Sequence, residues 1–145
     1  MHRAIIALLA GWIGTLVMAS SAPAAGLKAG VVRVDITPPA GQFLWGYAAR
    51  TTPAQGALDP LYARVLVLET GERRLALVVL DLGRVFGPAS LERLRAAARQ
   101  SSGITNVVVQ ATHTHSGPVI IDEYPGGAAP EWESAAVEKI GKAIH

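Results

Sequence analysis

Residues 106–118 read Asn-Val-Val-Val-Gln-Ala-Thr-His-Thr-His-Ser-Gly-Pro, so three valines lead into two histidines and a Gly-Pro break. Consecutive valines favour a packed β-strand over a helix, and we expect a buried strand that brings His113 and His115 to its carboxyl end. Side chains two apart on an extended backbone point to the same side, which predicts that both imidazoles face one pocket with Thr114 turned away. Two such imidazoles suit a zinc site or an acid–base pair, so an enzyme is the leading hypothesis.

The residues before this strand have the pattern of a β-α-β unit. Residues 75–80 are apolar throughout, as expected for a strand covered on both faces, and they end at Asp81. Pro88 suits the first position of a helix, and Gly103 suits its end. Ligand sites in α/β sheets collect at the carboxyl ends of the strands, so Asp81 and His113 should border one site.

Two more strands are expected upstream. Residues 31–36 alternate apolar and polar side chains, which predicts a strand with one polar face. Residues 62–69 and 75–80 flank the turn Thr70-Gly71-Glu72 and predict a hairpin. Residues 48–60 are expected to form a loop. The hairpin and the β-α-β unit together predict an α/β fold with a mixed sheet.

A second helix is expected to begin at Pro130. Its apolar residues recur every four positions, at Trp132, Ala136, Ile140 and Ile144. The chain stops inside this pattern, and the sequence offers no visible partner for the stripe. We therefore expect residues 25–145 to be the N-terminal portion of a larger layered α/β catalytic domain.

Composition limits the function classes. The formal net charge is only +2, so the sequence predicts no strongly basic surface, which argues against nucleic acid as a partner. The chain has no cysteine, so it can form no disulfide and offers no thiolate as ligand or nucleophile.

The first 24 residues resemble a targeting segment. Arg3 precedes an apolar run from Ala4 to Val17, and Ala22-Pro23-Ala24 fits a cleavage site. We expect a secretory signal peptide over residues 1–24, cut after Ala24, and a secreted or periplasmic protein. The alternative is an uncleaved N-terminal anchor.

Three further residues each allow two interpretations. Asp81 either orients a histidine ring from behind or caps the turn after its strand. Ser116 is either a nucleophile beside a histidine or a turn residue. Gly46 either lets the backbone approach a ligand closely or simply forms a turn.

A catalytic zinc needs about three protein ligands and one open position. Histidine supplies two of them at most in this region, and the spacing places no third ligand. The remaining candidates are Asp81, Asp122, Glu123 and Tyr124.

The segment from Ala111 to Pro118, Ala-Thr-His-Thr-His-Ser-Gly-Pro, resembles the zinc-site segment of the neutral/alkaline non-lysosomal ceramidases. The resemblance runs from Ala29 to Pro118. Weaker matches to the same family follow in the same order, and they are Asp35-Ile36-Thr37, Leu44-Trp45-Gly46-Tyr47, Tyr62-Ala63-Arg64 and Asp81-Leu82-Gly83.

This resemblance implies a zinc-dependent amidase that cleaves the N-acyl bond of ceramide to give sphingosine and a fatty acid. By residue match, His113 is a Zn²⁺ ligand. His115 is a catalytic residue and, with the backbone of Gly46, lines the substrate pocket. The resemblance also implies a ceramide-like lipid substrate, peripheral membrane contact through that substrate, and a further His, Glu and Tyr ligand far downstream.

Two other hypotheses remain. One is a secreted, non-catalytic binding module in which the histidines form a partial metal site or a pH-sensitive site. The other is a barrel-type metal hydrolase with a His-x-His pair, which predicts repeated strand–helix units. The early hairpin between Tyr62 and Leu80 argues against the barrel.

Overall fold

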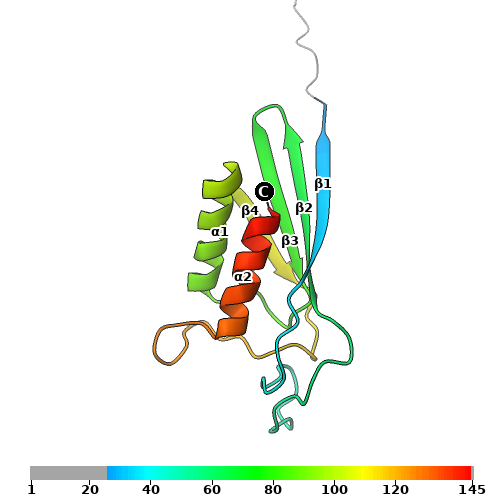
Figure 1. Cartoon of the computed structure of the whole chain (residues 1–145), viewed down its shortest axis with the longest axis vertical. Coiled ribbons are helices and arrows are strands. Elements are labelled where there is room, and N and C mark those ends of the chain that lie inside the picture. Colours follow the sequence, from blue (N-terminus) through cyan, green and yellow to red (C-terminus); the bar gives the residue numbers. More distant parts are fainter. Residues whose placement is uncertain (1–25, 145) are drawn as a thin grey trace, which may run out of the picture.

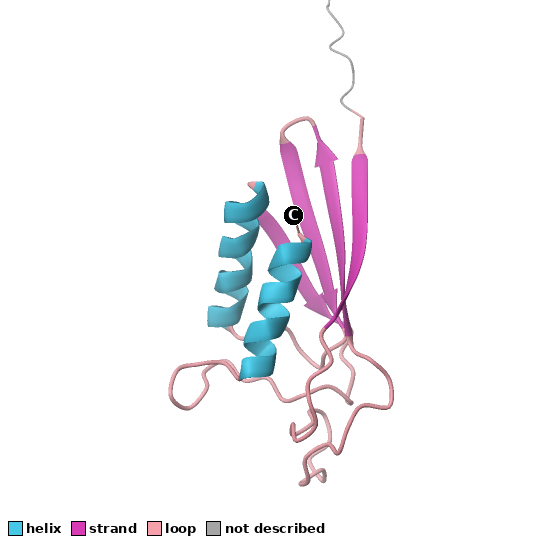
Figure 2. Ribbon diagram, in the orientation of Figure 1, coloured by secondary structure: helices cyan, strands magenta, loops and turns pink. Residues whose placement is uncertain are grey.

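The computed structural model describes residues 26–144, and the predicted signal peptide lies outside them. Four strands form one sheet, and two helices lie on one of its faces (Figures 1 and 2). The strands are β1 (Lys28–Asp35), β2 (Tyr62–Thr70), β3 (Arg73–Leu80) and β4 (Asn106–Ala111), and the helices are α1 (Pro88–Ser102) and α2 (Glu131–Ala143).

The strand order in the sheet is β1-β2-β3-β4, which is also the order along the chain. Strands β1, β2 and β3 pair antiparallel, whereas β3 and β4 are parallel with α1 crossing between them. Gly71 has a φ of 57° in the turn of the hairpin, a conformation that glycine adopts without strain. The predicted hairpin, β-α-β unit and mixed α/β sheet are confirmed.

Helix α1 begins and ends as its sequence predicts. Pro88 occupies the first turn, and Gly103 closes the helix in the left-handed conformation with a φ of 69°. The N–H of Gly103 donates to the carbonyl of Arg99 at 3.1 Å, which satisfies a carbonyl of the last turn. The buried side of α1 carries Leu94 and Ala98.

The apolar stripe of α2 has packing partners, so the expectation that nothing covers it was wrong. Helix α2 folds back onto the face of the sheet that α1 covers, and it contacts α1, β1 and β2. A Cβ placed on Gly141 would lie 3.0 Å from the Cβ of Ala97, so the two helices approach closely. The predicted stripe is buried at all four positions, Trp132, Ala136, Ile140 and Ile144.

The opposite face of the sheet differs from a second expectation, because within residues 26–144 β3 and β4 are covered by helices on one face only. The inward side chains of β3, such as Val78, are buried, whereas the outward ones are half-buried. One outward row crosses the sheet through Val31, Leu66, Leu77 and Val108. Val31 is 81% exposed and Val108 is 51% exposed. Within residues 26–144, both helices lie on the other face (Figure 2).

A buried carboxyl group joins the two helices near their N-terminal ends. Glu133 is fully buried and accepts hydrogen bonds from the hydroxyl of Ser90 at 2.5 Å and from that of Tyr124 at 2.6 Å. The pKa of Tyr124 is raised, first by burial of the phenol and then by its bond to Glu133. This network links α1, α2 and the loop between β4 and α2.

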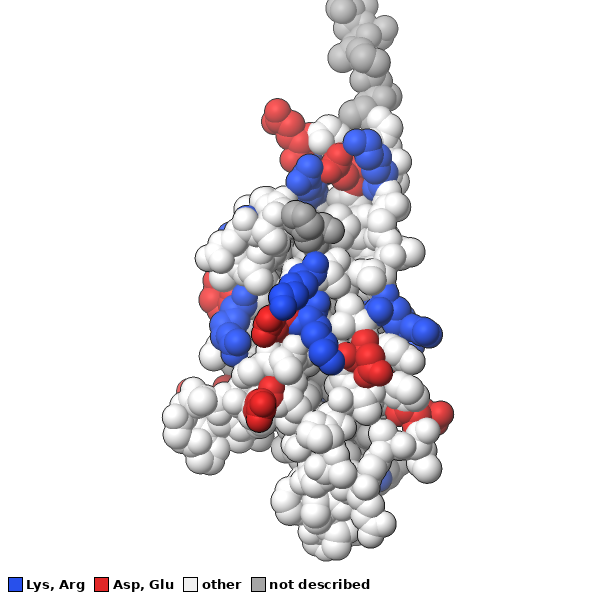
Figure 3. All heavy atoms as spheres, viewed as in Figure 1, with Lys and Arg blue, Asp and Glu red and all other residues white. Residues whose placement is uncertain are grey.

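Basic and acidic side chains are interspersed over the face of the molecule that carries α2 (Figure 3). The loops at the lower end of the same view are largely uncharged. Within residues 26–144, neither helix is long and apolar enough to cross a membrane.

Candidate functional site

The two histidines lie at the carboxyl edge of the parallel strands, as predicted. Beyond Ala111 the chain continues beside the end of β3. The N–H of Thr112 donates to Leu80 at 2.9 Å, and the N–H groups of His113 and Thr114 both donate to the carbonyl of Leu82 at 3.0 and 3.2 Å. The backbone of the site is therefore fixed to the sheet.

The backbone at His113 is not extended, so the expectation that an extended backbone turns both histidines to the same side was wrong. Strand β4 ends at Ala111, and His113 has a φ of 66°, the single positive value among the non-glycine residues of 26–144. Histidine is one of the residues that tolerates this region. The imidazoles nevertheless lie together, with the ring centroids of His113 and His115 5.2 Å apart.

Two aromatic residues contact the histidine pair. The ring of Trp45 lies 4.9 Å from that of His113 and 5.1 Å from that of His115, centroid to centroid. Tyr47 lies 5.0 Å from His115. All three contacts are edge-on, an arrangement that aromatic pairs prefer. The sequence identified Leu44-Trp45-Gly46-Tyr47 as a family match, but it did not predict that Trp45 and Tyr47 contact the histidines.

Backbone hydrogen bonds hold the aromatic loop at the site. The N–H of Trp45 donates to the carbonyl of Gly117 at 2.9 Å, and the N–H of Val119 donates to that of Phe43 at 2.8 Å. Leu44 and Pro118 form an isolated β-bridge between the two loops. The Gly-Pro break predicted after the histidines thus forms the docking point for the loop that follows β1.

The ring of His113 is oriented by a backbone carbonyl. Its Nδ1 lies 2.9 Å from the carbonyl oxygen of Gly83. A carbonyl can only accept, so Nδ1–H donates and, in the neutral ring, Nε2 keeps its lone pair. A metal-binding histidine commonly donates its other N–H to a carbonyl in this way.

Asp81 has partners other than the histidines. Its carboxylate accepts from the guanidinium of Arg64 at 2.6 Å and from the N–H of Tyr62 at 3.1 Å. These bonds tie the end of β3 to the start of β2, an arrangement that neither interpretation of Asp81 predicted. The backbone carbonyl of Gly83, and not Asp81, orients the ring of His113.

Two glycines make room for the rings. Gly46 has a φ of 108°, and a Cβ placed on it would lie 2.4 Å from Cγ of His115. A Cβ on Gly83 would lie 2.3 Å from Cε3 of Trp45. Gly46 therefore lets the backbone pass against the catalytic candidate His115 itself.

The other candidate residues are engaged elsewhere. Ser116 lies in a turn, where its N–H donates to Oγ1 of Thr114 at 3.2 Å. Asp122 is paired with Arg84, and Tyr124 is bonded to Glu133. Within residues 26–144, no three His, Asp or Glu side chains are grouped so that they could hold a metal ion. Glu123, the remaining candidate ligand, lines a hollow beside Glu133.

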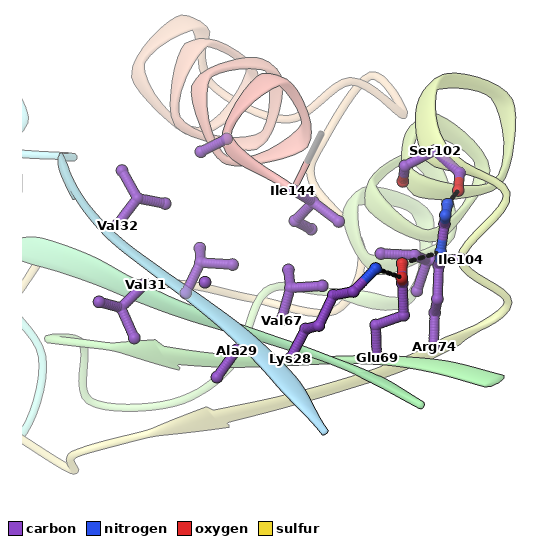
Figure 4. Close-up of a pocket in the computed structure, with 13 residues that line it drawn as sticks. Lys28, Ala29, Val31, Val32, Val67, Glu69, Arg74, Ser102, Ile104 and Ile144 are labelled. Atoms are coloured by element: carbon purple, nitrogen blue, oxygen red, sulfur yellow. Dashed lines mark hydrogen bonds and ion pairs between the residues drawn. The ribbon is translucent and has the colours of Figure 1, made fainter. Parts of the chain in front are cut away.

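Two hollows of similar size lie at opposite ends of the sheet. The first, of about 470 Å³, lies beside the start of β1 (Figure 4). There Glu69 bridges Lys28 and Arg74, and these two cations lower the pKa of its carboxyl. Among residues 26–144 its lining includes no histidine, and it lies at the end of the sheet away from the histidine site.

The second hollow, of about 430 Å³, adjoins the histidine loop. Thr114 and Ser116, which alternate with the two histidines, form part of its wall. Most of its lining is apolar and comes from the loop between β1 and β2, including Pro38, Pro39, Leu44, Ala54, Ala57, Leu58 and Leu61.

Comparison with known proteins places the chain in a family. Residues 27–126 match the family model described as neutral/alkaline non-lysosomal ceramidase, N-terminal. The chain is 35% identical over 95 residues to the neutral ceramidase of Pseudomonas aeruginosa, an alignment that covers 61% of this chain and 14% of that protein.

Two solved structures share the fold. The crystal structure of neutral ceramidase from Pseudomonas aeruginosa superposes with a TM-score of 0.68 at 30% identity, over 83% of this chain and 21% of that one. A ceramidase complexed with C2 gives the same TM-score and identity over 83% and 20%. The chain thus spans about a fifth of the solved chains. Because the family model covers residues 27–126, more than half of the chain, and the fold agrees, the chain belongs to the neutral/alkaline non-lysosomal ceramidase family.

Proposed function

We propose that this chain supplies part of the active site of a zinc-dependent hydrolase. The reaction is cleavage of the N-acyl amide bond of a ceramide-type lipid to give sphingosine and a fatty acid. The observation that carries the proposal is the pair of adjacent imidazoles, with Nδ1 of His113 committed to Gly83 and its Nε2 left as a donor of a lone pair. Membership of the ceramidase family supports the reaction class.

His113 fits the part of a zinc ligand. Its exposed side chain and its carbonyl-bonded Nδ1 leave Nε2 available, and imidazole nitrogen is a common ligand of zinc. No three-residue metal group is present within residues 26–144, so the remaining ligands would come from outside this range. Bound zinc would polarise the amide carbonyl and activate water.

His115 is proposed as the catalytic residue that moves a proton at the scissile amide. Its ring is half-buried between Trp45, Tyr47 and His113, which restricts its orientation. The backbone of Gly46 passes directly against this ring. The Gly46 backbone and the two imidazoles would therefore line the place of the substrate amide together.

The apolar hollow beside the histidine loop supports a substrate with a hydrocarbon chain, because its lining is mostly proline, leucine and alanine. A membrane lipid of this kind would bring the protein into peripheral contact with a bilayer. Export through cleavage after Ala24 is part of the same proposal and is supported by the pattern of residues 1–24.

The absence of a three-residue metal group within residues 26–144 favours one second candidate, a binding module with a partial histidine site. The two candidates differ in turnover. A binding module would bind a ceramide or a metal ion without releasing fatty acid.

Hydrolysis of a short-chain ceramide separates the candidates. We expect the protein, in the length that its gene encodes, to release fatty acid from this substrate. His115→Ala should lower kcat by about 10²- to 10⁴-fold, the usual contribution of a positioned acid or base. Its thermal unfolding should be unchanged, because the His115 side chain is half-buried in a loop.

Ser116→Ala is the matched control on the same loop. We expect it to retain activity, because the bond that closes the turn is donated by the backbone N–H of Ser116, which the substitution keeps. Loss of activity in Ser116→Ala alone would indicate a serine nucleophile instead. Absence of turnover in the wild type, with binding retained, would favour the binding module.

A further inference from the structure

The side chain of Arg50 reaches the histidine site from the loop between β1 and β2. Its Nη1–H donates to the carbonyl oxygen of His115 at 2.8 Å, across 65 residues of sequence. Its guanidinium carbon lies 5.1 Å from the ring centroid of Tyr47. Its backbone N–H donates to the carbonyl of Tyr47 at 3.0 Å and closes a turn.

These contacts place Arg50 against both elements that hold the His115 ring, and Arg50 also lines the hollow beside the histidine loop. One is the backbone of His115, to which the guanidinium is bonded directly. The other is Tyr47, whose ring lies against the imidazole with centroids 5.0 Å apart and also lies under the guanidinium. Arg50 thus contacts the His115 backbone and the aromatic residue that braces its side chain.

The backbone of His115 needs this hydrogen bond because it lies beyond the backbone hydrogen bonds that fix residues 112–114 to the end of β3. The hydrogen bonds to Leu80 and Leu82 end at Thr114, and the next backbone bond to the aromatic loop is made by Gly117. His115 lies between these two fixed points. The bond from Arg50 to its carbonyl is the long-range hydrogen bond that closes this interval.

We propose that Arg50 is a positioning residue for His115. This inference rests on the proposed function for its effect on turnover, but its effect on the ring can be observed without turnover. The guanidinium suits the task because it can bond a carbonyl while it stacks on an aromatic ring. Lysine keeps the charge and one donor but lacks the planar stacking surface.

The test uses Arg50→Met, which keeps the length of the side chain and removes both the donor and the cation. In metal-free protein with selectively labelled histidine, we expect the ring resonances of His115 to shift and broaden in this variant. In turnover of a short-chain ceramide, kcat should fall by about 10- to 100-fold, the cost of a misplaced catalytic group, while KM changes little. Arg50→Lys should recover part of kcat.

Arg33→Met is the matched control. Arg33 also stacks on a tyrosine, with its guanidinium carbon 4.2 Å from the ring centroid of Tyr62, but it lies on the outward face of β1. We expect this variant to leave the His115 resonances and kcat unchanged.

Unchanged His115 resonances in Arg50→Met would overturn the inference, as would an equal shift in Arg33→Met. A loss of kcat/KM that comes only from KM would also overturn it, because Arg50 would then act in substrate binding. If the wild type shows no turnover, the proposed function fails, whereas the resonance shift still tests the contact between Arg50 and His115.

Discussion

Gly46→Ala is expected to displace His115 and to remove most of the ceramide hydrolysis. The new Cβ would lie 2.4 Å from Cγ of the imidazole, closer than two carbon atoms can approach, so the ring or the loop must move. A shift of about 1 Å in a catalytic group costs on the order of 10²-fold in rate. The φ of 108° adds strain of about 1–3 kcal/mol to the folded state. The rate of ceramide hydrolysis checks the displacement of His115, and the free energy of unfolding checks the backbone strain.

Gly41→Ala separates the clash from the backbone strain. Gly41 lies in the same loop with a φ of 93°, but a Cβ placed on it meets nothing within 4 Å. This variant should lose a similar amount of stability and retain its activity. Equal activity in the two alanine variants would show that Gly46 has no steric role at His115.

Glu133→Ala is expected to destabilise the fold more than any exposed substitution on α2. The variant removes two hydrogen bonds and leaves the hydroxyls of Ser90 and Tyr124 without their acceptor. Buried polar groups that lose a partner cost about 1–3 kcal/mol each, so we expect a loss of about 3 kcal/mol in the unfolding free energy. Denaturant titration measures this loss.

The pKa of Tyr124 gives a second readout of the same network. The bond to Glu133 is one of the causes that raise this pKa, so it should fall toward its ordinary value in Glu133→Ala. Glu131→Ala is the control, because Glu131 is an exposed carboxylate on the same helix. If Glu133→Ala matched this control in both stability and the Tyr124 pKa, the network would have no structural role.

Local patterns predicted most of the fold. The turn at Gly71, the proline at the start of α1 and the glycine after it each act through their own backbone preferences, and each lies where expected. The faces of the sheet could not be predicted in this way. An apolar run such as residues 75–80 has the same sequence whether one face or both are covered, and within residues 26–144 the paths of the two helices decide which face is covered.

The site, like the fold, was predicted only where local sequence decides the structure. The His113–His115 pair was predicted from spacing, but the backbone at His113, with its φ of 66°, is bonded to Leu82, which lies just beyond the end of β3. The contacts of Trp45 and Arg50 with the histidines join loops far apart in the chain. No local pattern carries such information, and Arg50 gave no signal in the sequence.

Zinc content is the most direct test of the histidine site. The protein, in the length that its gene encodes, is loaded with zinc, separated from free metal by gel filtration and analysed by emission spectrometry beside His113→Ala and Ser116→Ala. We predict about one zinc ion per wild-type and Ser116→Ala chain. His113→Ala should retain its fold and lose the metal. Equal zinc in the His113→Ala variant, or none in the wild type, would contradict the assignment of His113 as a ligand.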